Sequence, residues 1–488
     1  MEETDEITLE AVKQRAVKGI AVLTGRTFFF SLISLFATGL LTFYLAPSEF
    51  GVFWIVSAVV NFLAYFSDVG LAAALIQKKE KLSSEDLKTT FTVQQILVIV
   101  LLLALFFAAP TLQRIYALTP AGVKLLYALG ASLFLSSLKT IPSVLMEREL
   151  EFGKLTIPQV LENLVYNILA VLLAWKGFGV ASFTYAVLAR GIIGLFAIYV
   201  LRPWVPSFGI SRESLKKLLS FGLPYQLNTF LATVKDDGMT VVLGGIIGPA
   251  GIGLLGWAQK WGYAPLRFFM DHVIKVTFPA FARMQDEKEE LARAVTRSIF
   301  FICFLVFPSV VGLLIVSPIL VQIIPRYEKW APALVPLSFI AVNTVFAAVT
   351  TQLTNLLNSI GKIKTTFKLM VFWTTITWLL VPFMAVKFGV NGAAGAYALI
   401  GTTSVIAIYI VRRIVKFSLF DSALRPAISA VVMGIVLLVT RRYLAVSLSS
   451  VWILVATGFS VYLLTIYLLV GASIIADAKK SFSNLFSK

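Results

Sequence analysis

The chain is poor in the residues that build disulfides, metal sites and soluble surfaces. Its 488 residues include one cysteine, Cys303, and one histidine, His272. A single cysteine excludes an intrachain disulfide and a cysteine-rich metal site, and a single histidine argues equally against a histidine-based one. Charged residues make up only 14% of the chain, which is too few to cover the surface of a soluble domain of this size. We therefore expect neither a metal site nor a large soluble domain.

Apolar residues take the place of the missing charges. They make up 58% of the chain, and its mean hydropathy is +0.88. A helix that crosses a bilayer needs about 20 consecutive apolar residues, and segments such as 90–112 and 450–474 meet that demand. Apolar runs of this kind, separated by polar breaks, predict about fourteen spans. The sequence therefore predicts an all-α polytopic membrane protein.

Lysine and arginine are unevenly distributed over the predicted loops. If the N-terminus lies in the cytoplasm, most of them fall in inner loops, as do Lys78, Lys79 and Lys81. Cytoplasmic loops of membrane proteins are enriched in these residues, and this accounts for most of the net charge of +17. We expect a multi-pass protein of the cell (inner or plasma) membrane with both termini in the cytoplasm. No nucleic-acid partner is expected, because the chain has no soluble basic domain.

Matching segments indicate an internal duplication. The proline and glycine of "LAPSEFG" recur 202 residues later in "IGPAGIG", and "KGFGVASFTYAVL" is matched later by "KFGVNGAAGAYAL". A unit of about six helices used twice gives two parallel repeats about an axis along the membrane normal. We expect two six-helix lobes around a central cavity, as in a transporter that alternates between inward-open and outward-open states. The expected layout is a cytoplasmic N-terminal segment at 1–17, an N-lobe of spans 1–6 at 18–203, a cytoplasmic linker at 204–216, a C-lobe of spans 7–12 at 217–417, spans 13–14 at 418–476 and a cytoplasmic tail at 477–488.

Charged residues fall on one face of a predicted span near the middle of the chain. On a helix with about 3.6 residues per turn, Lys260, Arg267, Asp271 and Lys275 share that face. A charge that faces lipid is unfavourable by several kcal/mol, so this face is expected to point inward. It is interpreted either as a cavity wall that attracts an anion or as a ladder of ion pairs that locks helices together.

Other predicted spans carry further ionisable residues. The candidate substrate-binding cations of the cavity are Arg26, Lys139, Arg190, Lys235, Lys260, Arg267 and Lys275. The candidate carboxylates for coupling to H⁺ or Na⁺ are Asp68, Glu162, Asp236, Asp237 and Asp271. Arg26 could instead extend to the inner interface, and Asp68 could cap a helix break. Asp236 and Asp237 could equally be compensated by the neighbouring Lys235.

Aromatic and amide side chains are candidates for sugar contacts. Trp257 and Trp261 flank the charged face and could stack on sugar rings, and Asn355 could hydrogen-bond to sugar hydroxyls. The tryptophans could equally be interfacial belt residues, and the asparagine could join helices by hydrogen bonds. No catalytic residue and no metal ligand is predicted.

Several segments resemble one known family. The stretches "LAPSEFGVFWIVSAV", "DVGLAAALIQKKEKLSSEDL", "VLMERELEFGKL" and "GFGVASFTYAVLARG" are similar to the polysaccharide transporter family, the O-antigen and exopolysaccharide flippases. That family belongs to the multidrug/oligosaccharidyl-lipid/polysaccharide exporter superfamily. The resemblance implies a flippase, not an enzyme, that moves polyprenyl-diphosphate-linked oligosaccharide from the inner to the outer leaflet by alternating access. It also implies a role in lipopolysaccharide or exopolysaccharide biosynthesis.

The same resemblance implies the cofactors and partners. The expected partners are the lipid-linked oligosaccharide, the lipid bilayer and other membrane proteins of polysaccharide assembly. Coupling to an H⁺ or Na⁺ gradient is expected in place of ATP, in agreement with the absence of a GxxxxGK[ST] phosphate loop from the sequence. No other cofactor is expected.

Two other functions are weighed against this one. A multidrug or cation extruder of the same superfamily would need a net acidic cavity, whereas the predicted spans carry an excess of cations. A polytopic glycan polymerase or ligase would carry a substantial catalytic outer loop. The longest outer connections here, such as "QRIYALTPAGVK", are too short to fold alone.

Overall fold

The structure, a computed structural model of the chain, describes residues 26, 29–30 and 32–471, except the side chains of 227–229, 231–232 and 271–272. Its secondary structure is helical, and the described residues include no strand, so the predicted all-α class is confirmed. Packing divides the chain into two compact units, Met1–Gly253 and Leu254–Lys488. Each unit is described by itself below. The lobe limits expected from the repeat stay a prediction.

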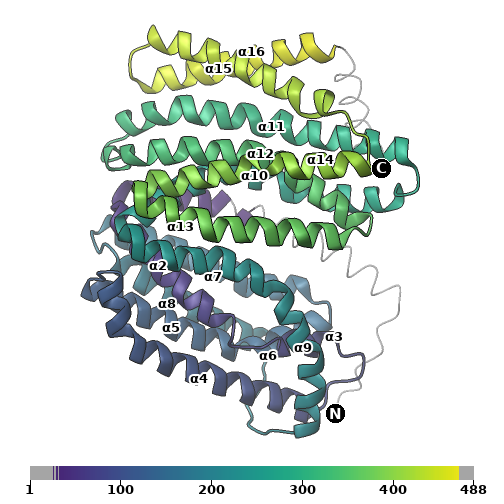
Figure 1. Cartoon of the computed structure of the whole chain (residues 1–488). Coiled ribbons are helices and arrows are strands. Elements are labelled where there is room, and N and C mark those ends of the chain that lie inside the picture. Colours follow the sequence, from purple (N-terminus) through teal and green to yellow (C-terminus); the bar gives the residue numbers. More distant parts are fainter. Residues whose placement is uncertain (1–25, 27–28, 31, 472–488) are drawn as a thin grey trace. The chain divides into compact units, whose positions relative to one another are not determined.

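The first unit consists of long helices interrupted by short ones (Figure 1). Its elements are α2 (Pro47–Ala64), α3 (Leu71–Gln77), α4 (Ser84–Ile115), α5 (Pro120–Leu138), α6 (Thr140–Arg148), α7 (Phe152–Trp175), α8 (Ala181–Leu201), α9 (Arg212–Thr233), the π-helix η1 (Val234–Gly238) and the start of α10 (Met239–Arg283). Helix α7 packs along α8, and α8 packs along α5. This three-helix group positions the site described below.

Local sequence explains where several helices begin. Pro47 is the first residue of α2, where its missing N–H and fixed φ are favourable. The Glu49 carboxylate accepts a hydrogen bond from the backbone N–H of Ala46 at 2.6 Å. Ser83 caps α4 by accepting a hydrogen bond from the N–H of Asp86. Polar residues at these helix ends thus satisfy backbone N–H groups that have no partner within the helix.

Breaks in the helices coincide with charged residues. Lys139 separates α5 from α6, and its backbone N–H bonds to Ser136 while its carbonyl accepts from Ser143. The π-helix η1 lies between α9 and α10 and contains Lys235, Asp236 and Asp237. Single π-turns inside helices are frequent at functional positions.

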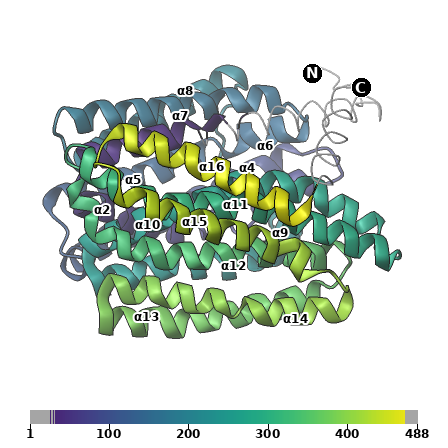
Figure 2. The same cartoon turned by 90° about the horizontal axis from the view of Figure 1, so that it is seen from above.

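The second unit is built around an apolar core. Its elements are the remainder of α10, α11 (Lys288–Ile323), the 3₁₀-helix η2 (Glu328–Ala333), α12 (Leu334–Ser359), α13 (Ile363–Thr402), α14 (Ser404–Ile414), the π-helix η3 (Phe420–Leu424), α15 (Arg425–Arg442) and α16 (Leu448–Val470). Helix α11 contributes the fully buried Ile299, Ile302 and Cys303 to the core. Helices α15 and α16 lie side by side in both views (Figures 1 and 2).

The predicted count of fourteen membrane-spanning helices is not confirmed by the described residues, which leave out part of the first predicted span at 18–46. Within the described residues, eleven helical stretches are long and apolar enough to cross a bilayer. One reason is that two helices joined at a glycine kink are counted as one stretch. Gly389, with φ 59°, lies inside the stretch Ile363–Ile414, which covers two predicted spans. The multi-pass character is confirmed and the exact count is not.

Candidate functional site

A polar cavity of about 360 Å³ lies in the first unit. It is lined by Arg26, Phe30, Gln159, Glu162, Asn163, Tyr166 and Arg190. Four of these residues are on α7, one is on α8, and Arg26 and Phe30 precede α2. A polar cavity among apolar helices is a candidate site. Polar and charged side chains within membrane spans are energetically unfavourable, and where they occur they commonly mark a functional site.

The α7 residues reach the cavity together because of helical spacing. Gln159, Glu162, Asn163 and Tyr166 stand at intervals of three, one and three residues, so they form one stripe along the helix. The stripe lies near the middle of α7, one of the candidate membrane spans. The sequence therefore places amide, carboxylate and phenol groups side by side within a candidate membrane span.

Glu162 contacts two cations at different distances. Its Oε1 accepts a hydrogen bond from Lys139 Nζ at 2.6 Å, and the two side chains are each 13% exposed. Its Oε2 lies 3.6 Å from Arg190 Nε, and the Arg190 side chain is 52% exposed. Lys139 is thus tightly bound and shielded, whereas Arg190 is loosely held and open to the cavity.

A glycine on α8 makes room for this carboxylate. A Cβ atom placed on Gly194 would overlap Oε1 of Glu162. Glu162 therefore lies directly against the α8 backbone, one turn along from Arg190. The close packing of α7 on α8 fixes the distance between the carboxylate and the guanidinium.

Arg26 supplies a second guanidinium to the cavity. Its Nη1 donates a hydrogen bond to Oε1 of Gln159, and its guanidinium carbon lies 5.8 Å from the centre of the Phe30 ring. Its Nε is buried and has no hydrogen-bond partner among the described residues. Arg26, Arg190 and Lys139 together outweigh Glu162, so the site has an excess of two positive charges and favours an anion.

The other ionisable candidates of the first unit lie apart from these lining residues. Asp68 accepts hydrogen bonds from the N–H of Ala72 at 3.2 Å with both oxygens, as a residue that caps a helix break does. Lys235 lies 3.6 Å from Asp236, and the Asp237 side chain hydrogen-bonds with Asn61. Local partners are thus present for all three carboxylates.

The predicted charged face belongs to α10 in the second unit. Lys260, Arg267 and Lys275 are exposed on this helix, while Leu266 and Met270 of the same segment are buried in the core. The Asp271 side chain lies outside the described residues. The three cations are therefore exposed on the helix whose other residues pack into the core, and the role of this charged face stays a prediction.

The sugar-contact candidates are in the packed interior of the second unit. Trp257 is 5% exposed, and its ring stacks on that of Trp330 at 5.7 Å. Trp261 is partly buried beside it. Asn355 is buried and donates a hydrogen bond to Thr277 Oγ1 at 2.9 Å. The Asn355 hydrogen bond agrees with the helix-joining alternative for that residue. The sugar-binding role of all three residues stays a prediction.

Sequence reasoning missed four lining residues. Phe30, Gln159, Asn163 and Tyr166 are not among the predicted site residues. The polar stripe in an apolar span is a usable signal for the three on α7, but not for Phe30. Lys139 was predicted as a cavity cation, and the structure places it behind Glu162 and not among the lining residues. The first unit thus brings Arg26, Glu162 and Arg190 together.

The duplicated prolines and glycines contact each other within the first unit. A Cβ atom on Gly51 of α2 would overlap the carbonyl oxygen of Pro249 on α10, and one on Gly253 would overlap that of Pro47. The contact is reciprocal, since each glycine faces the proline of the other copy. The part of α10 that follows the kink at Gly248 therefore meets the start of α2 backbone to backbone.

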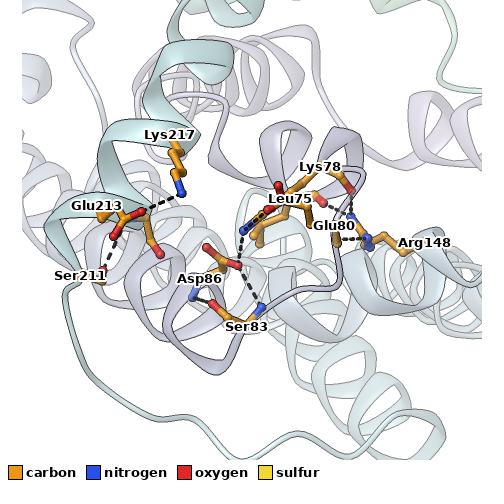
Figure 3. A network of polar contacts seen from close by, with 10 residues as sticks. Leu75, Lys78, Glu80, Ser83, Asp86, Arg148, Ser211, Glu213 and Lys217 are labelled. Carbon is orange, nitrogen blue, oxygen red and sulfur yellow. Dashed lines mark hydrogen bonds and ion pairs between the residues drawn. The ribbon is translucent and has the colours of Figure 1, made fainter. Parts of the chain in front are cut away.

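A network of polar contacts fastens the loop between α3 and α4 (Figure 3). Lys78 Nζ donates to Asp86 Oδ2 at 2.7 Å, and the N–H of Ser83 donates to the same oxygen at 2.9 Å. Arg148, at the end of α6, donates to the carbonyls of Leu75 at 2.6 Å and of Glu80 at 2.9 Å. The network holds the ends of α3, α4 and α6 together.

Comparison with known proteins yields matches along most of the chain. Residues 40–335 match the model of a family described as "Polysaccharide biosynthesis protein". The succinoglycan biosynthesis transport protein ExoT of Rhizobium meliloti (strain 1021) is 25% identical over 270 residues, 55% of this chain and 54% of that protein. The chain thus spans about half the length of that relative.

Two further proteins extend the coverage. The lipopolysaccharide biosynthesis protein WzxC of Escherichia coli (strain K12) is 25% identical over 349 residues, 71% of this chain and 70% of that protein. A solved structure of the lipid II flippase MurJ in an inward closed conformation superposes with a TM-score of 0.75 at 16% identity. It covers 92% of this chain and 99% of its own. At this identity the superposition shows a shared fold.

Proposed function

Because the chain belongs to the polysaccharide biosynthesis protein family, we propose that it is a flippase for lipid-linked oligosaccharide. The observation on which this depends most is the cavity lined by α7, α8 and the segment before α2, which lies beside candidate membrane spans and carries an excess of positive charge. The names of the relatives support it, since one is a succinoglycan transport protein and one a lipopolysaccharide biosynthesis protein. The cargo is a polyprenyl diphosphate that bears a short glycan.

The cavity binds the diphosphate of the cargo. Arg26 and Arg190 present planar guanidinium groups, which match phosphate oxygens in a bidentate manner. The amides of Gln159 and Asn163 add hydrogen bonds. The ring of Tyr166 offers an apolar surface with a polar edge to the first sugar. A cationic drug would meet the wrong charge here, so the extruder alternative is disfavoured.

Movement of the cargo follows from alternating access. The close contact between Gly51 and Pro249 holds α2 and α10 together at one end, and it has to separate when the protein opens on that side. Coupling to H⁺ or Na⁺ uses a carboxylate outside the cavity, for which Asp236 and Asp237 in the π-helix are the first candidates. The protein acts in the cell membrane with both termini in the cytoplasm, as a transporter and not as an enzyme.

Reconstitution into proteoliposomes tests the proposal. The protein is expected to move a polyprenyl-diphosphate-linked oligosaccharide across the bilayer, scored by access of an added glycosidase. Arg26→Gln with Arg190→Gln should slow this by at least about tenfold, because both cations for the diphosphate are lost. Lys176→Ala, at the exposed end of α7, is the control and should flip normally. Equal flipping by the double variant, or a change in glycan length, would refute the proposal.

A further inference from the structure

Glu162 lies closer to Lys139 than to Arg190, and this difference indicates a role for the carboxylate in the cavity. We propose that Glu162 is an internal counter-anion: it holds Arg190 while the cavity is empty and releases it to the cargo diphosphate, and Lys139 neutralises Glu162 throughout. Glu162 is then a positioning residue that acts through Arg190. This proposal rests on the proposed function, because it takes the cavity as the site of the diphosphate.

Lys139 is the permanent partner of Glu162. The two atoms are 2.6 Å apart and both side chains are largely shielded, so the pair is a short, charge-assisted hydrogen bond. Lys139 projects from the break between α5 and α6, whose backbone bonds to Ser136 and Ser143 fix its origin. It is absent from the lining of the cavity. Removing it would leave a buried carboxylate whose remaining partner is Arg190.

Arg190 is the exchangeable partner. Its Nε lies 3.6 Å from Glu162 Oε2, beyond the usual hydrogen-bond range of about 2.7–3.2 Å. Half of its side chain is exposed, and its guanidinium carbon lies 6.0 Å from the centre of the Tyr166 ring. The donors of the guanidinium thus remain available to a ligand. A diphosphate carries more charge than a carboxylate and accepts from the guanidinium in a bidentate manner, so it competes successfully for Arg190.

Glu162 cannot act equally on Arg26. The Arg26 guanidinium is held by Gln159 on the same helix, and no ion pair with Glu162 exists among the described residues. If Glu162 acts through Arg190, the effect of a Glu162 variant should depend on whether Arg190 is present. Neutralising Glu162 should help an anion that binds through Arg190 and should do nothing once Arg190 is gone.

Binding of inorganic pyrophosphate and of farnesyl diphosphate to the full chain in detergent tests this by calorimetry. Glu162→Gln should tighten binding of both probes by about tenfold, since Arg190 is no longer shared. The same gain is expected in the Arg26→Gln background, and no gain in the Arg190→Gln background. An equal gain in affinity in the Arg190→Gln background would overturn the proposal, because Glu162 would then repel the anion directly by its charge and not through Arg190. A gain with farnesyl diphosphate alone would also overturn it.

The Lys139 variants provide an independent readout. Lys139→Met should weaken pyrophosphate binding by about tenfold although the residue does not line the cavity, because the uncompensated carboxylate then retains Arg190. Lys139→Arg should restore binding. If Lys139→Met does not fold, the Glu162→Gln series decides the matter without it. Should the wild type bind neither probe, the proposed function fails; should it bind both while Glu162→Gln changes nothing, only this inference fails.

Discussion

Gly51 on α2 lies so close to Pro249 on α10 that a Cβ atom at Gly51 would overlap the Pro249 carbonyl oxygen. Gly253 stands in the same relation to Pro47, so two copies of one duplicated segment contact each other through their backbones. Small residues allow helices in a membrane to approach this closely. The two segments that match in the sequence thus contact each other in the folded chain.

A methyl group at this contact is expected to force the two helices apart. Gly51→Ala should destabilise the packed state by about 1–3 kcal/mol, as overpacking does elsewhere, because the neighbouring atoms are backbone and cannot rotate away. The thermal unfolding midpoint in detergent measures this. Gly153→Ala is the control, since a Cβ there meets nothing within 4 Å. An unchanged midpoint for Gly51→Ala would show that the two helices do not pack this closely.

Arg148 is expected to hold the loop between α3 and α4 in place. Arg148→Met removes the donors for the carbonyls of Leu75 and Glu80 and should lower stability by about 1.5–3 kcal/mol, as the loss of a charged hydrogen bond does. Amide hydrogen exchange over 78–83 should become faster. Lys154→Met, whose exposed pair with Glu151 is on the surface, should change little. Equal exchange in both variants would contradict the assignment.

Trp257 is expected to support the second unit by packing. Trp257→Ala leaves a cavity beside Trp330 and should lower stability by about 3–5 kcal/mol. Trp257→Phe keeps an aromatic ring and should retain transport of the glycan. If Trp257→Phe is as stable as the wild type but no longer transports, the tryptophan contacts the sugar and the packing account is wrong.

The fold class followed from composition, whereas the span count did not. Long apolar runs require helices in a bilayer, because each backbone group must be bonded within its own segment. The count depends on whether a stretch is divided at a glycine kink, and Gly389, with its positive φ, joins two helices within Ile363–Ile414. Local sequence does not determine whether a helix is kinked or ends at such a glycine, because this depends on tertiary packing.

The site was predictable in part. Arg26, Glu162 and Arg190 stood out as charges in apolar spans, and the structure gathers them around one cavity. The pairing of Lys139 with Glu162 joins residues 23 positions apart on different helices, and Gly194 makes room for it. Such pairings depend on how α5, α7 and α8 pack, so no pattern along the chain identifies them.

Contact between the cargo and the cavity is the central claim, and site-specific photo-crosslinking measures it directly. A photoreactive phenylalanine derivative replaces Tyr166, which lines the cavity, or Trp175, which is exposed at the end of the same helix. Full-length protein in membranes that contain the polyprenyl-diphosphate-linked oligosaccharide should be crosslinked to it at position 166, and pyrophosphate should compete. No crosslink at 166, or an equal one at 175, would contradict the account.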